Sequence, residues 1–202
     1  MKLSEMKRAQ IVSAAETLFC TRGFDATSMD QVSQQANVSK RTVYNHFSAK
    51  NELFQAVLDN MFSRIAEGQA VAFDISVSID EQLKQIAQKE VDLLLSEEFI
   101  KIARVAFLQL LQDPSLAVSL SGKAVGCMRY FEAFLNAACQ AHKLKIDDIS
   151  LAAKQFVYQL KSLIFYPTLY GLEEISTSQQ NYVIEETVKL FLSRYQSTPH
   201  DG

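Results

Sequence analysis

The stretch "VSKRTVYNHFSAKNELF", residues 38–54, decides how the first third of the chain is interpreted. Ser39 is a good helix N-cap, and a helix from there to about Phe47 turns by about 100° per residue. Val43 and Phe47 then share one side of the helix, with Val38 just before the cap. The opposite side carries basic, hydroxyl, aromatic and amide groups, at Arg41, Thr42, Tyr44 and Asn45. A helix this short is not stable alone in water, so it must pack against neighbours.

A second short helix directly upstream supplies such a neighbour. Ser28 followed by Gln31 has the spacing of a capping box, and Val32 and Ala36 give this helix an inner face. Asn37 ends it, since asparagine tolerates a left-handed backbone. Two short helices joined by a tight turn are typical of a helix-turn-helix, which can place its second helix in the major groove of DNA. A polar face turned to solvent is the alternative for this pattern alone.

The remaining sequence is predicted to be helical throughout. Gly and Pro are scarce, at six and three among 202 residues, and apolar residues recur at spacings of three and four. A first helix runs from about Ser4 to Thr21, stops at Gly23 and carries an apolar stripe of Ile11, Ala15, Leu18 and Phe19. A fourth helix starts near Lys50, and later helices are expected at about 79–95, 98–112, 115–141, 147–171 and 179–196. The fold class is therefore all-α with about nine helices.

Two local features depart from simple helical periodicity. The segment "FDISVSID", residues 73–80, alternates like a strand but has no partner strand, so an extended connection is expected. Pro167 lies inside a predicted helix, where it removes a backbone hydrogen bond and should kink the chain. The sequence is expected to divide at about residue 65, into an N-terminal domain over 5–65 that holds the helix-turn-helix and a body over 66–198.

Charge is distributed unevenly along the chain. Residues 1–50 carry seven Lys or Arg and four Asp or Glu, a net charge of +3, so the remaining chain carries −6 of the total of −3. A basic head on an acidic body points to two different tasks, the first of them compatible with nucleic acid. A solvated charged face would give the same count.

Several function classes are disfavoured. No apolar run is long enough to cross a membrane and the N-terminus lacks a signal-peptide core, so a cytoplasmic location is expected. Cys20, Cys127 and Cys139 follow no disulfide or metal pattern and are expected in apolar packing. Cys139 with His142 gives only two ligands, too few for zinc. With no catalytic constellation in the sequence, no enzyme, metal or cofactor is expected.

The N-terminal third resembles a known family over a long, ordered span. Residues 5–65, and most clearly "IVSAAETLFCTRGFDATSMDQVSQQANVSKRTVYNHFSAKNELFQAVL", are similar to the DNA-binding domain of the TetR/AcrR family of bacterial transcriptional regulators. The most specific part is "VSKRTVYNHF" followed by Lys and then Glu-Leu. Asn37 stands where the family usually has Gly. Ala49 stands where a capping Ser or Asp is usual, which costs about 1 kcal/mol unless Ser48 replaces it.

The resemblance implies a set of DNA contacts. Carried over position by position, these are Thr27, Ser28, Lys40, Arg41, Thr42, Tyr44, Asn45, His46 and Lys50. Tyr44 and Lys50 are expected mainly on phosphates, and Arg41 and Asn45 are the candidates for reading bases, as arginine reads guanine and asparagine adenine.

The body resembles the AefR-like subgroup of the same family, through "FIKIARVAFLQLLQDPSLA" and "LKSLIFYPTLYG". Family membership implies a homodimer joined by the last two helices and a cavity for a small-molecule effector. Aromatic and polar side chains that could line it are Arg104, Phe107, Met128, Phe131, Phe134, Phe165, Tyr166 and Tyr170, although aromatic residues at helical spacing also form cores. Interface candidates, each equally suited to the core, are Phe156, Leu160, Leu163, Val183, Val188 and Phe191.

The expected function is a ligand-responsive repressor that binds a palindromic operator in double-stranded DNA as a homodimer. The alternative is a small-molecule-binding or interaction protein whose helix-turn-helix has lost its function. The sequence leaves open the operator, the effector and whether regulation is repression or activation.

Overall fold

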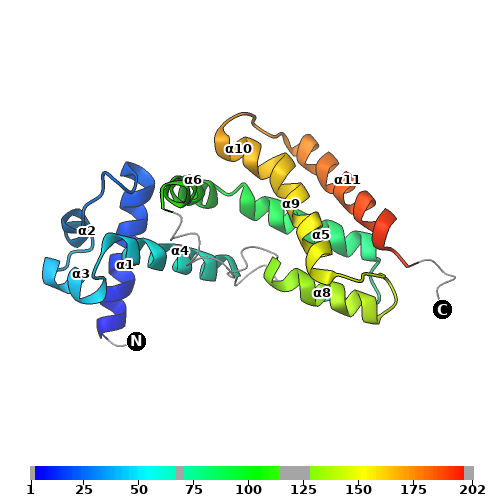
Figure 1. Ribbon diagram of the computed structural model, residues 1–202, viewed down its shortest axis with the longest axis horizontal. Coiled ribbons are helices and arrows are strands. Elements are labelled where there is room, and N and C mark those ends of the chain that lie inside the picture. The colour runs from blue at the N-terminus through cyan, green and yellow to red at the C-terminus, as the bar shows by residue number, and fades with distance from the viewer. Residues whose placement is uncertain (1–2, 67–70, 114–127, 198–202) are drawn as a thin grey trace. The chain divides into compact units, whose positions relative to one another are not determined.

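The computed structural model describes residues 3–66, 71–113 and 128–197, and every regular element in these ranges is helical. The all-α prediction is confirmed. The helices, labelled in Figure 1, are α1 (Leu3–Arg22), α2 (Met29–Gln35), α3 (Lys40–His46), α4 (Lys50–Ala66), α5 (Ile79–Leu94), α6 (Glu97–Gln112), α8 (Met128–Gln140), α9 (Ile149–Leu160), the π-helical turn η1 (Lys161–Phe165), α10 (Tyr166–Tyr170) and α11 (Thr177–Tyr195). The first half of the helix expected at 115–141 lies outside the described residues.

The chain forms two compact units. The first contains α1 to α4 together with α6, and the second contains α5 and α8 to α11. Helix α6 lies in the 66–198 part of the sequence and yet groups with the N-terminal helices. The boundary near residue 65 stays a prediction.

The first unit is built around the helix-turn-helix. Gly23 and Asn37 both have a left-handed backbone, with φ of 85° and 52°, and they end the helices that the sequence predicted they would end. The predicted stripe of α1 is buried, and so are Val43 and Phe47, the predicted anchors of α3. Apolar burial of this kind holds α3 in place, since seven residues could not stay helical alone.

The second unit has its core between α5, α8, α9 and α11. Figure 1 shows α11 alongside α9 and α5, which it contacts. Aromatic rings fill the centre: the Phe131 ring centroid lies 4.8 Å from that of Phe156, which lies 5.2 Å from that of Phe191. Of the interface candidates, Phe156, Leu160, Val188 and Phe191 are therefore core residues of this chain.

Both irregular features of the sequence have a structural counterpart. The segment 73–78 forms no strand, as predicted, and buried Gln82 holds it by accepting the Asp74 N–H and donating to the Asp74 and Val77 carbonyls. Pro167 lies one residue into α10, directly after the π-helical turn η1. A proline leaves a carbonyl one turn back without its amide partner, and the wider π turn is where the helix absorbs this change.

Candidate nucleic-acid interface

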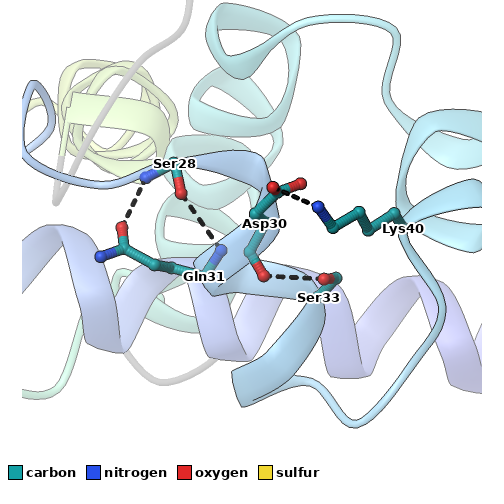
Figure 2. Close-up of polar contacts among 5 residues, drawn as sticks. All are labelled: Ser28, Asp30, Gln31, Ser33 and Lys40. Atoms are coloured by element: carbon teal, nitrogen blue, oxygen red, sulfur yellow. Dashed lines mark hydrogen bonds and ion pairs between the residues drawn. The ribbon is translucent and has the colours of Figure 1, made fainter.

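Helices α2 and α3 begin at positions fixed by side-chain caps, and Figure 2 shows those of α2. The Gln31 backbone N–H donates to Ser28 Oγ at 3.2 Å, and the Ser28 N–H donates to Gln31 Oε1 at 2.8 Å. The capping box predicted from these two residues is confirmed. Ser39 Oγ likewise accepts the Thr42 N–H at 3.1 Å at the start of α3. Caps of this kind are worth about 1 kcal/mol each.

The outer face of α3 carries most of the predicted contacts. It is formed by exposed or half-buried side chains, Arg41, Thr42, Tyr44, Asn45 and His46. On the inner face Val43 is completely buried and Phe47 almost so. The structure therefore separates an apolar anchor from a face of donors, an amide and an aromatic ring, as the sequence predicted. Whether these five side chains contact DNA stays a prediction.

Lys40, the first residue of α3, is paired across the turn with α2. Its ammonium forms an ion pair with the Asp30 carboxylate, and the Asp30 carbonyl accepts the Ser33 hydroxyl at 2.7 Å, both drawn in Figure 2. The two charged side chains remain half or more exposed. Sequence reasoning missed Asp30, because ten residues and a turn separate it from Lys40. Opposite charges at the starts of two consecutive helices were the available signal.

Thr27 and Lys50 are predicted contacts whose polar groups face the protein. Thr27 is only 2% exposed, and its hydroxyl donates to the Gly23 carbonyl at 2.8 Å. The Lys50 ammonium donates to carbonyl oxygens of Phe24, Asp25 and Thr27. Both side chains thus close the turn between α1 and α2. Their role at DNA stays untested.

Ala49 stands just before α4 without a capping side chain, and hydrogen bonds between Ser48 and Glu52 lie on either side of it in sequence. The Glu52 carboxylate accepts the Ser48 N–H at 2.7 Å and the Ser48 hydroxyl at 2.9 Å. These hydrogen bonds hold the pKa of Glu52 below its usual value, the Ser48 N–H being the main cause. Ser48 does not replace the cap in the usual way, because its N–H and its hydroxyl both donate to Glu52, and no N–H of α4 among the described residues donates to that hydroxyl.

A polar cleft of about 260 Å³ lies between α1, α4 and α6. Glu16 on α1 and Arg64 on α4 form an ion pair beside it. Cys20 lines the same cleft, so its surroundings are not the apolar ones expected from the sequence. Burial raises the pKa of the Cys20 thiol, with a further contribution from Glu16.

The predicted effector residues are divided between the two units. Arg104 and Phe107 lie on α6 in the first unit, and the other six lie in the second. Phe131 and Phe134 belong to the packed core, with Met128 against it. The Tyr166 and Tyr170 rings stack with centroids 6.1 Å apart, and burial raises the pKa of Tyr166. An effector cavity stays a prediction.

The outer face of α9 and α11 is grooved and carries both apolar and polar side chains. A groove of about 430 Å³ runs between the two helices, lined by Gln155, Phe156, Gln159, Thr187, Leu190, Phe191, Arg194 and Tyr195. Leu190 is 60% exposed, and Tyr158 and Tyr182 are more than half exposed. The hydroxyl of buried Thr187 has no hydrogen-bond partner within the described structure.

Other kinds of site were sought among the described residues. There, no three or more His, Cys, Asp or Glu side chains group closely enough to hold a metal ion. None of the described helices combines the length and the apolar character needed to cross a membrane.

Known protein families match both the N-terminal and the C-terminal part of the chain. Residues 11–57 match the family described as bacterial regulatory proteins, tetR family, and residues 81–197 match the C-terminal domain of the AefR-like transcriptional repressors. A solved TetR family transcriptional regulator from Pseudomonas syringae pv. tomato is 34% identical, with a TM-score of 0.79 over 96% of this chain and 99% of that one.

Two further proteins are similar over different extents. The solved flavonoid-responsive regulator FrrA is 26% identical, with a TM-score of 0.80 over 97% of this chain and 99% of that one. The HTH-type transcriptional activator FasR of Mycolicibacterium smegmatis is 32% identical over 44% of this chain, which spans 40% of its length. The chain thus aligns with about two fifths of this curated relative. From the family matches on both parts, this chain belongs to the TetR family of bacterial transcriptional regulators, which are not enzymes, and its C-terminal domain is of the AefR-like type.

Proposed function

We propose that this protein is a ligand-responsive repressor that acts in the cytoplasm as a homodimer on a palindromic operator. The observation that carries the proposal is the arrangement of α3, with Val43 and Phe47 buried and Arg41, Tyr44 and Asn45 exposed on the other side. A short helix with one buried and one polar face can enter the major groove without losing its packing.

The proposed contacts divide into two groups. Arg41 and Asn45 read bases, since both are exposed on α3 and both can pair bidentately with base edges. Phosphates and the groove edge are contacted by the remaining exposed or half-buried members of the set, Ser28, Lys40, Thr42, Tyr44 and His46. Thr27 and Lys50 are excluded from the proposed direct contacts, because their polar groups are used within the protein.

The proposed dimer uses the outer face of α9 and α11. Leu190 lines the groove between the two helices and is 60% exposed, and Tyr158 on α9 is 53% exposed, so this face leaves apolar side chains that a partner could cover. A second copy related by a two-fold axis would cover the same residues on both chains. Two reading helices then meet two half-sites about one or more helical turns of DNA apart, which gives the operator its palindromic symmetry.

The proposed effector binds in the 66–198 part, and the DNA in the 5–65 part. The flavonoid-responsive relative has the same fold at 26% identity, which supports response to a small molecule without naming one. Effector binding would favour a dimer whose two heads no longer match the half-site spacing, and so release DNA.

A selection from random-sequence duplexes, followed by a gel shift over a salt series, tests the proposal. The expected result is an enriched palindrome bound with an affinity that falls steeply as salt rises. A second probe, the DNA upstream of the protein's own gene, checks whether the enriched sequence occurs there. If neither duplex gives a salt-dependent shift, the helix-turn-helix has no DNA-binding function and the interaction-protein alternative is favoured.

A further inference from the structure

Lys50 is the first residue of α4, and its ammonium lies among carbonyl oxygens of the turn between α1 and α2. It donates to the Phe24 carbonyl at 2.9 Å, to the Thr27 carbonyl at 3.0 Å and, more weakly, to the Asp25 carbonyl at 3.4 Å. An ammonium has three N–H donors and no acceptor. The hydrogen-bonding capacity of Lys50 is therefore filled by the protein itself.

The Phe24 ring brings a second contact to the same ammonium. The Lys50 nitrogen lies 4.3 Å from the centroid of that ring, within the range of a cation–π interaction. Phe24 in turn packs against Phe19 on α1 and Phe54 on α4, with ring centroids 5.3 and 5.0 Å apart. The turn is thus held both by the aromatic cluster of Phe19, Phe24 and Phe54 and by the hydrogen bonds from Lys50.

The carbonyl oxygens that Lys50 binds come from the residues just before α2. Backbone carbonyls in a turn lack the regular partners of a helix and need another donor. Ser28, the cap of α2, follows Thr27 directly, so the position of these carbonyls sets where α2 begins. Through Lys50, the first turn of α4 is tied to the start of α2 across 23 to 26 residues of sequence.

We propose that Lys50 is a positioning residue that fixes the start of α2 against α4, and that it is not a phosphate contact. A phosphate would have to replace three carbonyl oxygens and an aromatic ring, and the turn would lose its donor. The effect on DNA binding rests on the function proposed above. The link between Lys50 and the turn is independent of that function.

The experiment compares substitutions of Lys50 with the same substitutions of Lys40 in the full chain. DNA affinity is measured by fluorescence anisotropy between 50 and 200 mM KCl, on a mixed-sequence 30-base-pair duplex and on the selected palindrome. Lys40→Met should lower the slope of log K against log salt by about 0.9, as loss of one phosphate contact does. Lys50→Met should leave the slope unchanged while weakening binding to the palindrome about tenfold, because a charged hydrogen-bond donor is lost.

Arginine separates the two roles further. Guanidinium binds phosphate at least as well as ammonium, but its planar fork does not match three converging carbonyls. Lys50→Arg should therefore weaken palindrome binding about as much as Lys50→Met, whereas Lys40→Arg should bind like the wild type. Wild-type affinity in Lys50→Arg, or a slope lowered by about 0.9 in Lys50→Met, would overturn the proposal.

Two further measurements cover two possible failures: a Lys50 variant that does not fold, and a wild-type protein that binds no DNA. In the wild-type protein, the Lys50 ammonium should give an NMR signal protected from exchange, and this signal should show no coupling to phosphorus in the DNA complex. A coupling to phosphorus would contradict the proposal even if Lys50→Met failed to fold. If the wild type binds no DNA, the proposed function fails, and amide exchange still decides on Lys50: Lys50→Met should speed exchange at Thr27 and Gln31 relative to Val57, and equal exchange would refute the link.

Discussion

The outer face of α3 and the outer face of α9 and α11 both lie over well-buried apolar side chains, but the second face exposes larger apolar groups among its polar ones. Val43 under α3 and Phe156 under the second face are each at most 1% exposed. Above them, α3 exposes Arg41, Tyr44 and Asn45, whereas the other face exposes leucine and tyrosine. Burial of apolar side chains fixes each helix in place, and the side chains that stay exposed determine which partner the helix suits.

The largest effect is expected from a charge introduced on the outer face of α9 and α11. Leu190→Glu would bury two carboxylates in the proposed dimer, one from each subunit, and should weaken dimerisation by about 3 kcal/mol or more. Analytical ultracentrifugation measures it, with Gln140→Glu as the control because Gln140 is exposed at the end of α8. A Leu190→Glu protein with the wild-type monomer–dimer equilibrium would show that this face does not join the subunits.

A smaller effect is expected at the polar face. Arg41→Ala should weaken binding to the selected palindrome by about 1 to 3 kcal/mol and relax the preference for the base pair that it reads. Lys89→Ala removes the same charge from an exposed position on α5 and should change binding little. Unchanged palindrome affinity in Arg41→Ala would remove Arg41 from the reading residues.

The ion pair between Asp30 and Lys40 should moderate DNA binding. Asp30→Asn removes the carboxylate that competes with phosphate for Lys40, so affinity for mixed-sequence DNA should rise about fivefold at 0.15 M salt, with the slope unchanged because the number of phosphate contacts stays the same. Asp25→Asn, which removes another exposed carboxylate of the same unit, should have less effect. In a double-mutant cycle, the effect of Asp30→Asn should disappear in a Lys40→Met background. If the gain persists there, Asp30 acts through general charge repulsion and not through Lys40.

The smallest effect is a pH dependence at the start of α4. The Ser48 N–H lowers the pKa of Glu52 in the folded protein, so the stabilisation by Glu52 is present above its unfolded pKa and lost as pH falls through the folded one. Thermal unfolding between pH 3 and 7 should show a slightly smaller loss on acidification in Glu52→Gln than in the wild type. Glu81→Gln, at an exposed carboxyl on α5, is the matched control. Equal acid sensitivity of Glu52→Gln and the wild type would mean that this contact contributes nothing to stability.

Much of the first unit could be predicted because its rules are local. Ser28 with Gln31, Ser39, Gly23 and Asn37 act on residues three or four positions away, and all four features are found where they were predicted. Ala49 was the uncertain point. The expected replacement by Ser48 is not found, because Ser48 donates both its N–H and its hydroxyl to Glu52, four residues on.

The second unit was less predictable, because its important choices are not local. Phe156 and Phe191 suited a core and an interface equally in sequence, and their ring contacts assign them to the core of this chain. Leu190, the neighbour of Phe191, is left outside. Periodicity gives a helix several apolar neighbours, and only packing against other helices determines which of them is covered.

The sequence by itself determined the helical class, the caps of α2 and α3, and which side of α3 is polar, since each depends on short-range spacing. Only the tertiary structure decided that Lys50 faces three carbonyls, that Thr27 is buried and that Asp30 meets Lys40. These contacts join residues 10 to 26 positions apart, at distances set by how α1, α2, α3 and α4 pack. Residue type gives a lysine its charge, and packing determines what that charge can reach.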